Sequence, residues 1–173
     1  MRVAQEYDLL RFDPRFQELM RRVMGSSVLG EDPRVLAGVA QSLVRAGRAA
    51  EAIPHLETAI ERYPAERSLP RWLYYLSLAH FVEERYEEAL DWAERALESN
   101  GDVHNSAFIQ FVRASSLTHL DRLDEARQAL NEAVRLWPGP LELERDLRFI
   151  FTVREPALQN RYLDGLRLAG LEG

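Results

Sequence analysis

The sequence contains neither cysteine nor lysine, and all 22 of its basic residues are arginine. Without lysine, no side chain can form a Schiff base with a substrate or act as the lysine of a phosphate-binding loop or a kinase. Without cysteine, there is no thiol nucleophile and no cysteine-rich zinc site. These two absences exclude several large classes of enzyme.

Long apolar runs are also missing. The run from Trp72 to Leu76 is among the longest, and it is far shorter than the roughly 20 residues that cross a bilayer. Glu6, Asp8 and Asp13 interrupt the N-terminal stretch in which a secretory signal would need an apolar core. We therefore expect a cytoplasmic protein with no membrane partner. The net charge of -6 also disfavours a nucleic-acid partner, which requires clustered positive charge.

Small residues return at a fixed interval along the chain. Ala52 and Ala59 are followed 37 residues later by alanines at positions 89 and 96, and 37 residues later again by alanines at 126 and 133. A period of this size is typical of stacked helical hairpins, each of which needs neighbours to bury its apolar face. Alanines seven residues apart share one helix face and let antiparallel helices approach closely. The sequence therefore predicts an all-α stack.

Capping residues, proline and glycine mark the ends of the predicted helices. Asp32-Pro33 opens the first hairpin, Gly47 ends its first helix, and Glu155-Pro156 opens the last helix of the chain. We expect turns at Glu84-Arg85 and Asp121-Arg122. The predicted organisation is one domain with N-terminal capping helices at 1–32, repeats at 33–69, 70–106 and 107–139, and C-terminal capping helices at 140–173.

Three segments carry the repeat most clearly: GRAAEAIPHL, ERYEEALDWAERAL and DRLDEARQALNEAVRLWP. They resemble the second helix of the tetratricopeptide repeat, a helix-turn-helix unit. The first helices follow the family pattern less closely, since the tryptophan position holds Leu36, Leu73 and Gln110. The resemblance implies a right-handed superhelix of hairpins whose role is to bind a protein or a peptide.

The C-terminal REPALQNRYLDGLRLAGL is similar to the tails of bacterial tetratricopeptide regions that are attached to adenylate or guanylate cyclases. This resemblance implies a regulatory relative, since no cyclase catalytic segment accompanies it. Two interpretations stay open. The chain is either an adaptor that docks a segment of a partner protein, or a dimerising or regulatory module of a bacterial signalling system.

In tetratricopeptide proteins the first helices of the hairpins line a concave groove that binds partners. Carried over to this sequence, the resemblance implies an aromatic centre flanked by arginines, which suits a hydrophobic or amphipathic segment with an acidic flank. The alternative is that these aromatic side chains pack against the chain's own terminal helix or against a second copy in a homodimer. The predicted groove residues are Arg34, Gln41, Arg45, Arg71, Tyr74, Leu78, Phe81, Phe108, Phe111, Ser115 and His119.

The histidines and clustered carboxylates do not form a recognisable catalytic or metal-binding pattern. No two of the four histidines are three or four residues apart. His80 falls in an inward position of its helix, where we expect a hydrogen-bonded core residue. Glu83, Glu84, Glu87 and Glu88 cluster at a turn and at the start of a helix, where negative charge suits the helix dipole. We expect no catalytic site, no metal and no cofactor.

Overall fold

The described part of the protein is built from helices. The computed structural model describes residues 32–99, 103–137, 151 and 153–171. The predicted N-terminal capping helices, and the part of the C-terminal cap before residue 151, lie outside the described residues. The described helices are α3 (Pro33–Arg45), α4 (Ala49–Arg62), α5 (Leu69–Val82), α6 (Tyr86–Glu98), α7 (Val103–His119), α8 (Leu123–Leu136) and α10 (Pro156–Leu168).

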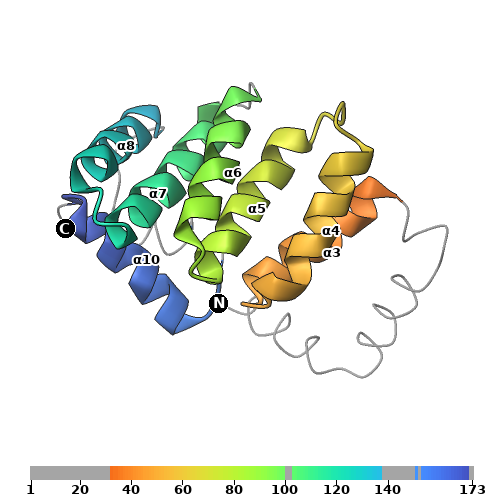
Figure 1. Ribbon diagram of the computed structural model, residues 1–173, viewed down its shortest axis with the longest axis horizontal. Coiled ribbons are helices and arrows are strands. Elements are labelled where there is room, and N and C mark those ends of the chain that lie inside the picture. The colour runs from red at the N-terminus through yellow and green to blue at the C-terminus, as the bar shows by residue number, and fades with distance from the viewer. Residues whose placement is uncertain (1–31, 100–102, 138–150, 152, 172–173) are drawn as a thin grey trace, which may run out of the picture.

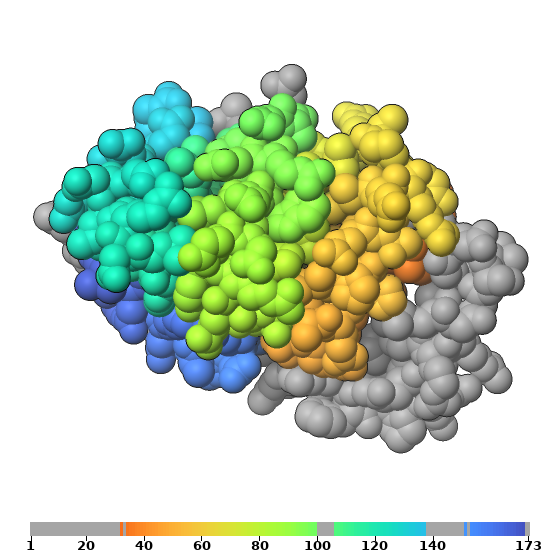
Figure 2. Space-filling view, viewed as in Figure 1, coloured from red at the N-terminus to blue at the C-terminus, as the bar shows by residue number. Residues whose placement is uncertain are grey.

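Six of these helices form three antiparallel hairpins, α3 with α4, α5 with α6, and α7 with α8 (Figure 1). α4 also packs against α5, and α6 packs against α7, the first helix of the next hairpin in each case; α5 packs against both α3 and α7. The first helices α3, α5 and α7 are therefore neighbours along one side of the stack. The second helices α4, α6 and α8 lie side by side in Figure 2, with α10 along the lower edge. This arrangement confirms the predicted all-α tetratricopeptide-type stack.

The ends of the helices are where local sequence predicts them. The Asp32 carboxylate accepts a hydrogen bond from the backbone N–H of Arg34 at 2.9 Å and so caps α3. Gly47 ends the same hairpin's first helix with φ +74°, a left-handed conformation that glycine adopts without steric cost. Glu84 and Asp121 take φ values of 60° and 58° in the corresponding turns of the next two hairpins. The predicted helix end at Gly47 and both predicted turns are confirmed.

The repeated alanines form the contacts between helices. All six of them, at 52, 59, 89, 96, 126 and 133, have an exposed fraction of 0%. A larger side chain at any of these sites would push two helices apart, and overpacking of this kind typically costs about 1–3 kcal/mol. The period seen in the sequence is thus the period of helix packing.

Candidate interaction surface

The predicted groove residues lie on the neighbouring first helices, but they differ widely in exposure. Five of them, Tyr74, Leu78, Phe81, Phe111 and Ser115, are buried. Gln41, Phe108 and His119 are half-buried, and the arginines at 34, 45 and 71 are exposed. Three of the four aromatic side chains in the predicted groove, those of Tyr74, Phe81 and Phe111, are therefore covered, while the arginines that flank them face solvent.

The C-terminal segment covers part of that aromatic centre. The ring of Phe81 on α5 lies edge-on to Tyr162 on α10 at 5.6 Å and to Phe151 at 6.0 Å. Tyr162 and Phe151 stack on each other at 4.3 Å. Burial raises the pKa of the Tyr162 phenol well above its usual value, and the neighbouring Tyr74 phenol adds to this effect. Ser115 on α7 donates a hydrogen bond from its hydroxyl to the Tyr162 carbonyl oxygen at 3.1 Å.

Polar contacts extend this interface to the ends of α3 and α5. Arg161 on α10 forms an ion pair with Glu84, which follows α5. The backbone N–H of Arg154 donates to the carbonyl oxygen of Arg45 at 3.1 Å. The segment from residue 153 to the end of α10 therefore touches all three first helices, and α10 runs obliquely along the lower edge of the stack in Figure 1.

Sequence reasoning missed a position in this interface that has no room for a side chain. Gly165, inside α10, faces α7 so closely that an added Cβ would lie 2.3 Å from the Ser115 hydroxyl oxygen and 2.9 Å from the Thr118 hydroxyl oxygen. A glycine inside an amphipathic helix is a recognisable signal of close approach, since glycine costs helix stability. Such a glycine indicates that another element approaches the helix closely, but it does not indicate which element.

The arginines that flank the groove are engaged to different degrees. Arg34 pairs with the Asp32 carboxylate at 3.2 Å, and Arg45 donates to the Tyr75 hydroxyl at 2.7 Å. Arg71 is exposed and forms no ion pair with any other described residue. Of the three flanking arginines, Arg71 is therefore the one whose charge is not paired with a described carboxylate and whose side chain is not bound to a described hydroxyl.

Two histidines lie inside the first helices. His119 stacks on Tyr86 with the ring centroids 4.5 Å apart, and its pKa is lowered mainly by burial. His80 is buried, and burial likewise lowers its pKa, with a further contribution from Arg85. The prediction that His80 is hydrogen-bonded is wrong, since neither ring nitrogen has a partner in the described structure. Every residue of α5 from Trp72 to Val82 is buried, so this part of the helix has no exposed face and the His80 ring packs in the core.

The described residues contain no group of three or more His, Asp or Glu side chains that could hold a metal ion. None of the helices in the described ranges is both long enough and apolar enough to cross a membrane.

Comparison with known families matches a central segment of the chain. Residues 40–103 match the family model of the tetratricopeptide repeat. No curated protein and no solved structure matches the chain. The matched segment runs from within α3 to the beginning of α7, so it spans most of the first hairpin and all of the second. The match assigns residues 40–103 to the tetratricopeptide repeat, and the stacked hairpins on either side of this segment extend the same helical arrangement.

Proposed function

We propose that the chain is a non-enzymatic scaffold that binds a partner segment in the groove along α3, α5 and α7, and that α10 closes this groove until the partner displaces it. Tetratricopeptide repeats are in general protein–protein interaction modules. The observation that carries the proposal is the contact of Tyr162 with two groove residues, Phe81 and Ser115. α10 lies in the groove where a ligand would bind, so the side chains of α10 indicate which side chains a ligand would need.

The ligand that α10 imitates is an amphipathic helix. One face of α10 is buried through Leu158, Tyr162, Leu163 and Leu166, which is how helical segments commonly dock in grooves. A partner segment that replaces it would carry an aromatic side chain opposite Phe81. An acidic flank on that segment would reach the exposed Arg71.

The same contacts favour the regulatory interpretation of the sequence over a permanently open adaptor. A terminal helix that is tethered to its own binding site competes at an effective concentration on the order of millimolar. A partner must occupy the groove more strongly than the tethered α10 does. α10 would therefore set the partner concentration that binding requires. If α10 instead docks into the groove of a second copy, the result is a homodimer.

A peptide in trans tests the proposal. We would label a peptide of residues 153–171 and measure its binding by fluorescence polarisation to the parent chain, to Gly165→Ala and to Gly38→Ala. Gly165→Ala should bind the peptide most tightly, because the added methyl group weakens the docking of the chain's own α10. Gly38→Ala is the matched control, since its added Cβ meets nothing within 4 Å.

The proposal fails if the Gly165→Ala chain does not bind the peptide, or if it binds a peptide carrying Tyr162→Ala equally well. Sedimentation equilibrium on the parent chain separates the two forms of the proposal. If the chain is a monomer, α10 docks in the groove of its own chain. If the chain is a dimer that dissociates when Tyr162 is replaced, α10 docks in the groove of the second copy.

A further inference from the structure

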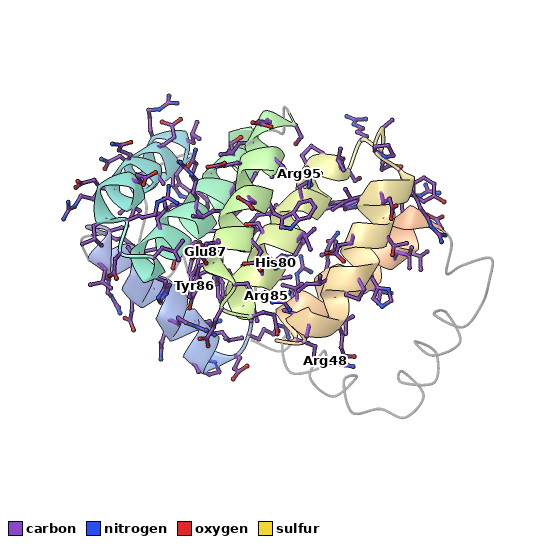
Figure 3. The ribbon with its side chains drawn as sticks, viewed as in Figure 1. Arg48, His80, Arg85, Tyr86, Glu87 and Arg95 are labelled. Carbon is purple, nitrogen blue, oxygen red and sulfur yellow. The ribbon has the colours of Figure 1, made fainter. Side chains whose placement is uncertain are left out.

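A second surface lies at the other end of the hairpins from the turns that α10 contacts. A cleft of about 810 Å³ opens between α4, α5 and α6, where α4 and α6 end and α5 begins. Figure 3 shows Arg95 near the upper end of α6 and Tyr86 near the lower end. The α10 interface and this cleft are therefore separate features of the same stack.

The floor of the cleft is apolar. It includes Ile60 on α4, Leu73 on α5 and Trp92 on α6. Ile60 and Leu73 are exposed by only 8% and 4%, whereas Trp92 is half-buried. A ligand that enters the cleft would therefore meet a small aliphatic surface beside a large, partly accessible indole ring.

The rim of the cleft is acidic. Glu57 and Glu61 project from α4 and Glu98 from α6, and all three are exposed. None of the three forms an ion pair with another residue of the described structure. Arg95 is the one basic residue among those that line the cleft, so the lining carries an excess of negative charge. Such a surface attracts cations and repels phosphate and carboxylate groups.

The indole of Trp92 already binds a guanidinium group. The central carbon of the Arg95 guanidinium lies 4.1 Å from the centre of the Trp92 ring, in cation–π geometry. Tryptophan is the best of the aromatic side chains for this interaction, and the planar guanidinium stacks on it more readily than an ammonium group does. The chain's own Arg95 thus displays the kind of contact that the cleft can offer to a ligand.

We propose that this cleft docks an arginine-bearing segment of a partner protein. An arginine of the partner stacks on the Trp92 indole in place of Arg95. An aliphatic side chain of the same segment covers Leu73 and Ile60, and further basic residues pair with the carboxylates of the rim. The proposal rests on the apolar floor, the unpaired acidic rim and the Arg95–Trp92 contact, and it is independent of what binds the groove along α3, α5 and α7.

Capped ten-residue peptides provide the test. One alternates arginine with leucine, a second alternates lysine with leucine, and a third alternates glutamate with leucine. Binding is followed through the indole N–H signals in a ¹⁵N–¹H correlation spectrum, in which Trp92→Leu assigns the Trp92 signal. We expect the arginine peptide to shift the Trp92 signal, the lysine peptide to bind more weakly, and the glutamate peptide not to bind.

Two sets of variants locate the site. Trp92→Leu keeps an apolar side chain but removes the aromatic face, and it should weaken binding of the arginine peptide about tenfold. The triple variant Glu57→Gln, Glu61→Gln, Glu98→Gln should weaken binding at least about tenfold and reduce its dependence on salt. The matched control changes the net charge equally at sites outside the cleft, with Glu87→Gln, Glu88→Gln and Asp124→Asn, and should bind like the parent.

Three outcomes would overturn the proposal. The first is that the arginine peptide binds without shifting the Trp92 signal. The second is that the control triple variant loses as much affinity as the cleft triple variant, which would indicate general electrostatic attraction. The third is that Trp92→Leu binds the arginine peptide as tightly as the parent does, which would place the peptide outside the cleft. Thermal unfolding of each variant, followed by circular dichroism, shows that a loss of binding is not a loss of fold.

Discussion

The packing of α10 on the stack can be tested with two glycine-to-alanine substitutions in the same protein. In the interior of an exposed helix, alanine is favoured over glycine by about 1 kcal/mol. At Gly38 on α3 an added Cβ meets nothing within 4 Å, so Gly38→Ala should raise the free energy of unfolding by about this amount. Gly165→Ala has the same intrinsic gain, so any difference between the two variants measures the contact with α7.

At Gly165 the steric cost exceeds the intrinsic gain. The added Cβ would lie 2.3 Å from the Ser115 hydroxyl oxygen, and 3.2 Å from the Ser115 Cα, which cannot rotate away. Overpacking of a close contact typically costs about 1–3 kcal/mol, and the hydrogen bond from Ser115 to the Tyr162 carbonyl contributes about 1 kcal/mol. We therefore expect Gly165→Ala to weaken the docking of α10 by about 1–3 kcal/mol overall.

Native-state hydrogen exchange is the most direct assay, because it reports local opening of α10 without global unfolding. A loss of about 1–3 kcal/mol lowers the protection of the α10 amides roughly 5- to 150-fold, while the amides of α4 and α6 keep theirs. Adding Ser115→Ala to Gly165→Ala removes the closest atom and should restore part of the protection, a coupling that a double-mutant cycle measures. The reasoning is refuted if the α10 amides of Gly165→Ala are as protected as those of the parent, or if Gly165→Ala raises the free energy of unfolding as much as Gly38→Ala does.

The remaining predictions concern the stack itself. Ala89→Leu should lower the free energy of unfolding in urea by about 1–3 kcal/mol, because Ala89 is fully buried between helices; an unchanged midpoint would contradict the packing described. His80 and His119 have lowered pKa values in the folded state, so these histidines bind protons at a higher pH in the unfolded state than in the folded state. The free energy of unfolding should therefore fall as the pH drops below about 6.5. Urea unfolding at pH 8 and pH 5 measures this loss, and His80→Leu should reduce it; an equal loss in the parent and in His80→Leu would show that His80 does not contribute. Arg161→Met should increase exchange in α10, because it leaves Glu84 without its ion-pair partner; unchanged exchange would mean that the pair adds nothing to docking.

Local chemistry explains why so much of the stack could be predicted from the sequence. Small residues at 52 and 59 and their repeats set how closely two helices approach, and this requirement holds in each hairpin. Asp32 caps its helix through its own neighbour Arg34, and Gly47 takes a conformation that its lack of a side chain permits. Each of these signals acts within one hairpin, so each can be read without knowledge of the rest of the chain.

Only the tertiary structure decided how the surfaces of the stack are used. The sequence predicted that Phe81 lies on a groove helix, but its contact with Tyr162 joins residues 81 positions apart and depends on where α10 docks. The absence of a partner for His80 depends on the packing around the whole of α5. Likewise, the cleft at Trp92 exists because the last turns of α4 and α6 meet the first turn of α5. Periodicity determines which residues face a neighbouring helix, whereas the meeting of distant side chains depends on the three-dimensional path of the chain.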